Sequence, residues 1–237
     1  IDDLHRMGLS PDKPVLYQSS RVEAYQDAID TLIKKGQAFD CACSRKDLSE
    51  SGQYPGTCRN GIPPGKAPRS IRFRVDTGLC TFHDKVQGMV SDSPATSGGD
   101  FIIKRADGLY AYQLAVVVDD HFQGVTQVVR GADLLDSTNR QICLQKALGF
   151  KTPDYLHHPV ATSADGKKLS KRFRSDPVNL EEPVAAVGQA LKFLGQNPPA
   201  GLSLSGLWEW ALAHWDSNRI PRVKTIPLGN EPTINNL

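Results

Sequence analysis

The sequence lacks any long hydrophobic run. Its longest uninterrupted apolar segment, Leu114 to Val118, has five residues, whereas a membrane-spanning helix needs about 20. No charged-then-apolar segment typical of a secretory leader opens the chain. Neither sign of charge dominates, because 28 Lys and Arg face 26 Asp and Glu and leave a net charge of +2, which excludes a polycationic packaging protein. These absences predict a soluble, cytoplasmic protein without a membrane partner.

Cysteine is scarce and odd in number, which argues against a disulfide framework. Of the five cysteines in 237 residues, Cys41, Cys43 and Cys58 lie within 18 positions of one another. A chain of this length buries a core without covalent staples. Clustered thiols in a protein without secretion signals favour metal ligation.

The three clustered cysteines have a spacing that suits Zn²⁺. Two thiolates two positions apart and a third after a Pro-Gly turn can converge on one tetrahedral ion. The alternative is three buried or free thiols without a metal. Spacing leaves three candidates for a fourth ligand, Tyr54, Cys80 and His83. Zinc chemistry in general favours the cysteine or the histidine over the tyrosine. We expect Cys80, if it is not a ligand, and Cys143 to be small core residues.

Hydrophobic periodicity predicts a helix from Ser20, with Glu23 completing a capping box and Gly36 ending it. From Phe39 to Gly99 the chain is rich in Pro, Gly and Ser, with strand-like alternation at 70–75. This texture predicts a compact insert with little helix.

After residue 100 the pattern becomes that of an α/β protein. We expect strands at 110–118, 125–129 and 155–161, and a helix from Asp133 to Leu148. A strand, a short polar loop and a helix in this order form half of a nucleotide-type unit. Two more helices are expected near 181–195 and 204–215, the second with an apolar stripe of Leu207, Trp208, Ala211, Leu212 and Trp215 facing the core.

Arg130 follows the strand predicted at 125–129 and precedes the helix. Doubly wound sheets bind ligands at this edge, and an Arg fork can grip a carboxylate through two parallel hydrogen bonds. Gly131 would let a ligand approach the backbone, and Asp133 is expected to cap the helix. Tyr112 is either a half-buried core aromatic or a hydrogen-bonding partner of the same acidic ligand.

Five basic side chains occupy eight positions after Gly166, namely Lys167, Lys168, Lys171, Arg172 and Arg174. Such a loop can neutralise a triphosphate as pyrophosphate leaves. The alternative is a solvated basic loop. The trio Asp119, Asp120 and His121 could bind a metal or act as acid and base, but a polar strand end that fixes the neighbouring loop is the favoured interpretation.

Together these segments resemble a known enzyme family. The run from Lys168 to Arg172 is similar to the KMSKS signature of class I aminoacyl-tRNA synthetases. The segments 112–124 and 129–134 resemble the glutamyl-tRNA synthetase branch. Within that branch the chain is most similar, over nearly its whole length, to the shortened family that acts on queuosine in tRNA(Asp).

The resemblance implies a reaction and a set of site residues. ATP, with Mg²⁺, and L-glutamate would form glutamyl-adenylate and pyrophosphate, and the glutamyl group would pass to the queuosine base at the wobble position of tRNA(Asp). Lys168 and Lys171 would be catalytic, with Lys171 contacting ATP. Tyr112 and Arg130 would bind glutamate. One structural zinc would be held by Cys41, Cys43, Tyr54 and Cys58.

The fold that the resemblance implies is a Rossmann-type catalytic domain with a zinc-bearing insert and C-terminal helices, in a monomer. The expected parts are the remainder of a first nucleotide-binding half at 1–38, a zinc-binding insert at 39–99, the second catalytic half with the KMSKS-like loop at 100–175, and a helical region at 176–237. The family's first strand and HIGH-like segment are not in this sequence. If the molecule starts at Ile1, we expect pyrophosphate exchange near background; if these residues are part of a longer polypeptide, we expect the reaction above to proceed.

Two alternatives stay open. The first is a truncated glutamyl-tRNA synthetase that charges tRNA(Glu), which is disfavoured because 65 residues follow Arg172 and an anticodon-reading domain needs about 100. The second is a non-catalytic, zinc-stabilised RNA-binding module that uses the basic loop and a stripe of Arg69, Arg72 and Arg74.

Overall fold

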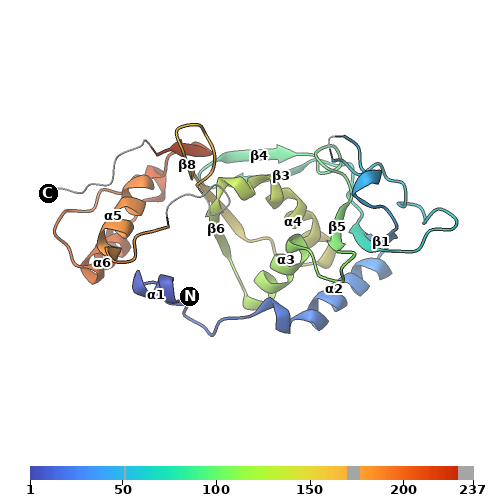
Figure 1. The fold of residues 1–237 in the computed structure, drawn as a ribbon, viewed down its shortest axis with the longest axis horizontal. Coiled ribbons are helices and arrows are strands. Elements are labelled where there is room, and N and C mark those ends of the chain that lie inside the picture. The colour runs from blue at the N-terminus through green and yellow to red at the C-terminus, as the bar shows by residue number, and fades with distance from the viewer. Residues whose placement is uncertain (51, 170–176, 229–237) are drawn as a thin grey trace.

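The computed structural model describes residues 1–50, 52–169 and 177–228, and three sections follow one another along its long axis (Figure 1). A small sheet lies at one end, a larger sheet and the helices packed beside it lie at the centre, and the two C-terminal helices lie at the other end. The helices are α1 (Asp2–Arg6), α2 (Val22–Lys34), α3 (Tyr112–Gln123), α4 (Leu135–Leu148), α5 (Pro183–Phe193) and α6 (Leu204–His214). The strands are β1 (Ala38–Cys41), β2 (Ser70–Phe73), β3 (Cys80–Asp84), β4 (Gly88–Asp92), β5 (Phe101–Lys104), β6 (Gln127–Gly131), β7 (Asp154–His158), β8 (Val160–Thr162) and β9 (Thr225–Pro227).

The larger sheet has the strand order β4-β3-β7-β6. Strands β6, β7 and β3 are parallel, and β4 is antiparallel to β3. Helix α4 connects β6 to β7, which confirms the strand, loop and helix pattern predicted from the sequence. Because the three parallel strands run the same way, their carboxyl ends meet at one edge, where α/β proteins bind ligands.

The small sheet is antiparallel, in the order β1-β2-β5. It shares a hydrophobic core with α2, α3 and α4, in which Ile29, Leu32, Ile103, Leu114 and Leu144 are fully buried. The pairing of strands crosses the boundary expected at residue 99: β3 and β4 precede it but belong to the larger sheet, and β5 follows it but belongs to the small one. Composition marks a change of texture along the chain, whereas pairing depends on contacts between distant segments.

The segment predicted as a strand at 110–118 is a helix, α3, so that prediction was wrong. A continuous apolar run does not distinguish a buried strand from a buried helix. Leu114, Val117 and Val118 lie at helical spacing on the buried face. Gly124 ends the helix in the left-handed conformation, with φ of 67°. Tertiary packing thus overrides the strand preference of the three consecutive valines.

Helix α2 confirms the helix predicted after Ser20 but not its cap. It begins at Val22 after the 3₁₀ turn Gln18–Ser20, and Arg21 takes the N-cap position without a side-chain hydrogen bond. The Ser20 hydroxyl instead donates to the Tyr17 carbonyl, at 2.7 Å. The capping box predicted at Ser20 and Glu23 does not form, so that prediction was wrong, and the N-cap lies one residue later, at Arg21.

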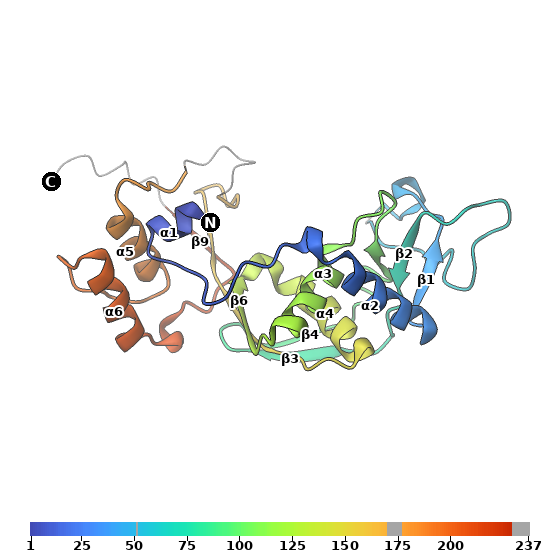
Figure 2. The same ribbon diagram turned by 90° about the horizontal axis from the view of Figure 1, so that it is seen from below.

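The two C-terminal helices pack against the start of the chain. Helix α1 lies beside α5 and α6 (Figure 2), and the Trp208 indole N–H donates to the Met7 carbonyl at 2.8 Å. In the apolar stripe predicted for α6, Leu207 and Ala211 are buried, but Leu212 is 84% exposed and Trp215 is 45% exposed. Trp208 is partly buried against Leu207 and Ala211, so only two of the five stripe residues are fully core.

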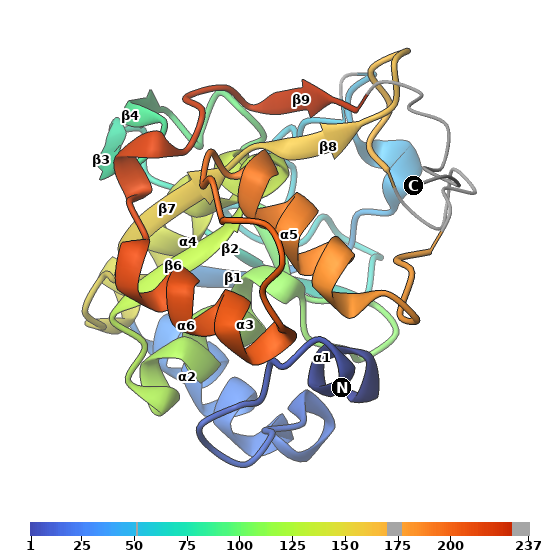
Figure 3. The same ribbon diagram turned by 90° about the vertical axis from the view of Figure 1, so that its left-hand side faces the viewer.

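Strands β8 and β9 form a short parallel pair beside the C-terminal helices (Figure 3). In the described part of the chain, no helix has both the length and the apolar character that crossing a membrane requires.

Candidate functional site

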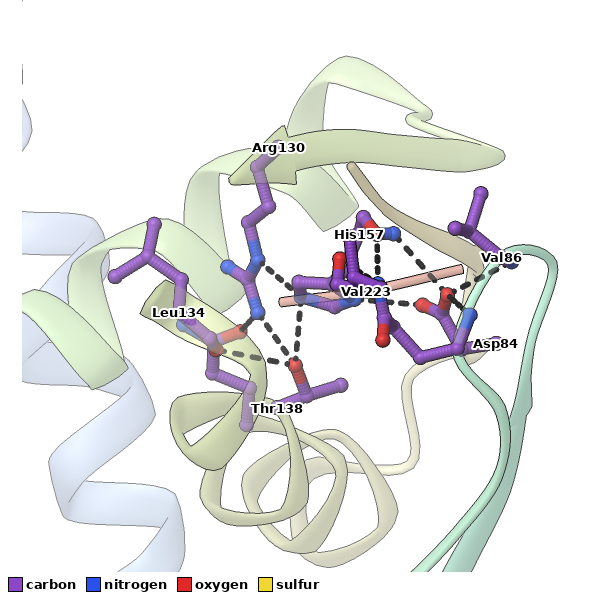
Figure 4. A network of polar contacts seen from close by, with 9 residues as sticks. Asp84, Val86, Arg130, Leu134, Thr138, His157 and Val223 are labelled. Atoms are coloured by element: carbon purple, nitrogen blue, oxygen red, sulfur yellow. Dashed lines mark hydrogen bonds and ion pairs between the residues drawn. The ribbon is translucent and has the colours of Figure 1, made fainter. Parts of the chain in front are cut away.

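Three neighbouring parallel strands each bring one polar side chain to the same edge of the larger sheet. Arg130 on β6 lies opposite His157 on β7, and Asp84 ends β3 on the far side of β7. The side chains of Asp84 and His157 are fully buried, and Arg130 reaches inward to them (Figure 4). Arg130 was expected from the sequence, but the other two residues were not. His157 lies inside the strand predicted at 155–161, which was the available signal, whereas no strand was predicted at Asp84.

The Arg130 guanidinium is almost saturated by internal partners. Its Nε donates to His157 Nε2 at 3.0 Å. Its Nη2 donates to Thr138 Oγ1 at 2.8 Å and to Gln141 Oε1 at 2.7 Å. Its Nη1 donates to the Tyr112 hydroxyl at 3.3 Å. The two-bond fork expected to face a ligand is therefore turned into the protein, and among the described residues nothing accepts the second Nη1 proton.

Tyr112 completes this outward-facing edge. It is the first residue of α3, and it is 47% exposed. Because its oxygen accepts the Arg130 bond, its own proton is available to a ligand. The Nη1–H group and the phenol O–H group therefore present two donors side by side, which suits one carboxylate.

The lysine-rich segment begins as a hairpin after β8. A turn at Asp165 and Gly166 closes it, with the Ser163 N–H donating to the Lys167 carbonyl at 2.8 Å. Lys167 pairs locally with Asp165 at 2.6 Å, whereas Lys168 Nζ reaches Asp133 Oδ2 at 2.5 Å.

Asp133 lies three residues after Arg130, so the hairpin faces the same sheet edge as Arg130. Lys171 and Arg172 lie outside the described residues.

Asp133 does not cap α4, so that prediction was wrong. The N-cap of α4 is Leu134, without a side-chain hydrogen bond, and the Asp133 carboxylate turns to Lys168 instead. A Cβ on Gly131 would lie 2.5 Å from Asp133 Oδ1. Glycine at 131 therefore leaves room for this carboxylate in the structure.

The three clustered cysteines meet in the small sheet and the loops beside it. Their sulfur atoms all lie within 4.8 Å of one another, and all three residues are buried. The Sγ atoms of Cys43 and Cys58 are 3.7 Å apart. Tetrahedral Zn²⁺ with Zn–S bonds of about 2.3 Å separates its sulfur ligands by about 3.8 Å. The cluster therefore fits a metal of this size.

Donors around Cys41 favour its thiolate, whereas burial and the neighbouring sulfur atoms raise the pKa of Cys43 to about 11. The Arg72 Nε–H group donates to Cys41 Sγ at 3.3 Å, and the backbone N–H of Cys43 donates to the same sulfur at 3.4 Å. Burial raises the pKa of Cys41, but the hydrogen bonds from Cys43, Arg72 and Tyr54 outweigh it and hold that pKa below its ordinary value. Hydrogen bonds of this kind to sulfur support metal-bound cysteines.

Arg72 is buried, at 5% exposure, and its guanidinium stacks on the Tyr54 ring at 4.0 Å. The exposed stripe of three arginines on which the RNA-binding alternative rests is therefore broken at its centre. Arg72 instead donates through Nη1 to the Asp100 carbonyl at 2.7 Å.

The three candidates for a fourth ligand lie in different places. The Tyr54 oxygen lies 3.8 Å from Cys41 Sγ and accepts the Cys58 N–H at 2.7 Å. Cys80 packs with Ile142 and Tyr155 in the core of the larger sheet, with Cys143 beside it. His83 is exposed on β3. Of the three, Tyr54 alone adjoins the thiols.

The trio Asp119, Asp120 and His121 does not converge on one point. The Asp119 carboxylate is buried on α3 and accepts bonds from the Tyr25 hydroxyl at 2.6 Å and from Arg21 Nε at 3.1 Å. His121 stacks on Phe150, with ring centroids 3.7 Å apart. Asp119 thus ties α2 to α3. Its place on a helix corrects the predicted strand end.

The sequence is similar to known proteins over most of its length. The family described as tRNA synthetases class I (E and Q), catalytic domain, matches residues 1–188. The chain is 46% identical to the glutamyl-Q tRNA(Asp) synthetase of Dechloromonas aromatica, over 95% of this chain and 79% of that protein. It is 47% identical to the protein of the same name from Pseudomonas aeruginosa, over 96% of this chain and 78% of that protein.

Solved structures show the same fold. A glutamate-tRNA synthetase from Elizabethkingia anophelis superposes with a TM-score of 0.73 at 22% identity. The match covers 94% of this chain and 56% of that one. The chain thus corresponds to a little over half of that structure.

Proposed function

Because the chain belongs to the glutamyl-Q tRNA(Asp) synthetase family, within the class I synthetases for glutamate and glutamine, we propose that it activates glutamate with ATP and glutamylates tRNA(Asp). The acceptor is the queuosine base at the wobble position. One observation supports the site most directly: Arg130, Tyr112 and Lys168 converge on the carboxyl edge of one parallel sheet.

Each group at this edge has a role in the proposed reaction. Arg130 Nη1 and the Tyr112 hydroxyl hold a carboxylate of glutamate through two charge-assisted hydrogen bonds. Lys168 leaves Asp133 and, together with Lys171, neutralises the ATP phosphates as pyrophosphate departs. Mg²⁺ accompanies ATP. The adenylate then passes its glutamyl group to the tRNA base.

We propose that Cys41, Cys43, Cys58 and Tyr54 hold one structural Zn²⁺. The proposal is supported by the sulfur separations, the position of the Tyr54 oxygen and the N–H groups aimed at sulfur. When bound, the ion holds β1 to the loop that carries Cys58. We also propose a monomeric, cytoplasmic protein divided into the four expected parts, of which the second and third exchange strands across residue 99.

Transfer of labelled glutamate tests the proposed function. The assay offers queuosine-containing tRNA(Asp), the same tRNA with guanine in place of queuosine, and tRNA(Glu), each with ATP. We expect label on the first alone, released when the modified base is excised and retained when the 3′ end is removed. Charging of tRNA(Glu) alone would support the truncated glutamyl-tRNA synthetase.

Lys168→Ala is expected to lower the turnover of glutamate-dependent pyrophosphate exchange roughly ten- to a hundredfold, because one cation facing the departing pyrophosphate is lost. Lys167→Ala is the matched control, since Lys167 is paired with Asp165 and not with the sheet edge. Equal rates for the two variants would remove Lys168 from the reaction.

Tyr54→Phe tests the fourth zinc ligand. The ring and its stacking on Arg72 are kept while the oxygen is lost. We expect zinc affinity, measured by competition with a chromogenic chelator, to fall roughly ten- to a hundredfold, as for the loss of a metal-supporting group. Tyr110→Phe is the control, because that hydroxyl bonds Gln26 away from the cluster. Unchanged affinity for Tyr54→Phe would assign the fourth position to another ligand.

A further inference from the structure

Asp84, His157 and Arg130 form one hydrogen-bonded chain across three neighbouring strands (Figure 4). Asp84 Oδ2 lies 2.6 Å from His157 Nδ1, and the Arg130 Nε–H group donates to His157 Nε2 at 3.0 Å. Both Asp84 and His157 have side chains that are 0% exposed. Neither residue reaches the outward-facing edge, so neither can touch a ligand there directly.

The position of each proton in this chain follows from the donors. A guanidinium group only donates, so His157 Nε2 must offer a lone pair to Arg130. The ring proton then lies on Nδ1 and is donated to Asp84. Thr138 Oγ1 also lies 3.1 Å from His157 Nε2. This contact does not change the assignment, because the Thr138 oxygen accepts from Arg130 Nη2 and its proton can go to the Leu134 carbonyl, at 3.3 Å, or to the lone pair of Nε2. His157 is thus a neutral ring in the Nδ1–H form.

Asp84 is held as a carboxylate in the core. One of its oxygens accepts the backbone N–H groups of Val86, Gln87 and His157, at 3.0, 2.8 and 3.2 Å. Burial raises the pKa of Asp84, but the hydrogen bonds from the His157 ring and from these backbone groups outweigh burial and lower that pKa. A charged acceptor therefore faces His157 Nδ1 and fixes the ring proton there.

We propose that Asp84 and His157 are positioning residues that hold Arg130 in the one orientation in which Nη1 and the Tyr112 hydroxyl face glutamate. The inference rests on the proposed function, because it assigns the ligand of Arg130 to that reaction. Asp84 fixes the tautomer of His157, and the tautomer supplies the acceptor for Arg130 Nε. With Nε and Nη2 occupied, the guanidinium plane cannot rotate, and Nη1 is left for the ligand.

Asp84→Asn tests the tautomer with almost no change of shape. The amide oxygen can still accept the hydrogen bonds of the backbone N–H groups. The amide nitrogen then points toward His157 Nδ1. The ring must then accept at Nδ1 and carry its proton on Nε2, where it meets the Nε–H of Arg130. An Asp-to-Asn change beside a catalytic histidine acts through the wrong tautomer in the same way. We expect the KM for glutamate in pyrophosphate exchange to rise at least tenfold and the KM for ATP to stay within twofold.

Two variants of His157 separate positioning from stability. His157→Asn keeps a donor toward Asp84 but has no atom near Arg130 Nε, so we expect the KM for glutamate to rise as in Asp84→Asn. His157→Gln extends a carbonyl toward Arg130 and leaves Asp84 with fewer donors. We expect it to unfold at a lower temperature and yet keep a KM for glutamate within threefold of the parent. If the role of Asp84 and His157 were purely structural, the KM for glutamate would instead rise most in the variant with the lowest unfolding temperature.

Nitrogen NMR of histidine-labelled protein reads the tautomer without any assay of activity. We expect His157 to show a protonated Nδ1 and an unprotonated Nε2 in the parent, and the reverse in Asp84→Asn. Asp154→Asn, at the exposed start of the same strand β7, is the matched control and should leave both nitrogens unchanged.

A doubly protonated ring or an Nε2–H ring in the parent would overturn the inference, as would an unchanged KM for glutamate in both Asp84→Asn and His157→Asn. If Asp84→Asn does not fold, the NMR spectrum of the parent and the KM values of the two His157 variants test the inference in its place. A parent protein with the expected tautomer but no glutamate-dependent exchange would instead contradict the proposed function alone.

Discussion

Arg130→Ala is expected to reduce kcat/KM for glutamate in pyrophosphate exchange by roughly 10²–10³-fold. Truncating one partner of a hydrogen-bonded charge pair in a desolvated site costs about 2–5 kcal/mol, and this arginine carries the charge that the proposed ligand requires. The loss should appear mainly in the KM for glutamate, because the ATP side of the edge, with Lys168, stays in place.

Two comparisons make the Arg130 result specific. Tyr112→Phe removes the second donor of the same edge and should cost roughly ten- to a hundredfold, as for one hydrogen bond to a charged group. Arg105→Ala removes an exposed guanidinium that pairs with Asp107, and it should leave the KM for glutamate unchanged. If Arg130→Ala lowers kcat/KM for ATP as much as kcat/KM for glutamate, Arg130 does not bind the amino acid. If it has no effect, the carboxylate site lies elsewhere.

Cys58→Ser is expected to abolish stoichiometric zinc and unfold the region around the small sheet. Structural zinc contributes on the order of 10 kcal/mol in small metal-dependent domains, and the cysteine cluster packs with few apolar side chains, chiefly Phe39, Leu48 and Ile62. Bound zinc is measured by elemental analysis, and the loss of structure by hydrogen exchange at β1 and β2. The exchange rates there should rise well above those of β6 and β7.

Cys143→Ser is the matched control, because Cys143 packs beside Cys80 in the larger sheet and not in the cluster. It should keep one zinc per chain. A strong chelator should reproduce the Cys58→Ser pattern in the parent protein, and added zinc should reverse it. A Cys58→Ser protein that keeps one tightly bound zinc and parent exchange rates would contradict a metal site built on these three cysteines.

The helix and strand pattern was readable from the sequence wherever periodicity and end signals agree. The β6, α4 and β7 unit has a strand, a turn and a helix ended by Gly149, and all three were predicted. The segment that became α3 was not, because its apolar run is continuous and its β-branched residues favour a strand. In the folded protein this segment is a helix that buries its Leu114 side in the core.

The metal site shows the same division. The spacing of Cys41, Cys43 and Cys58 was enough to predict that they meet. It left the fourth ligand open, because distance along the chain does not say which side chain a turn brings near. The fold places Cys80 in the core of a different sheet and brings the Tyr54 oxygen beside the thiols.

The sequence by itself determined the kinds of group available: an arginine after a strand, a lysine-rich hairpin, three clustered cysteines. The tertiary structure decided how Arg130 is used. Its Nε donor is taken by His157, 27 residues later in the chain, and His157 is held by Asp84, which lies 73 residues before His157. Parallel pairing sets these residues side by side, and its register depends on burial over the whole sheet. No local pattern encodes such contacts, so only the folded chain shows that the arginine meets its ligand with one edge.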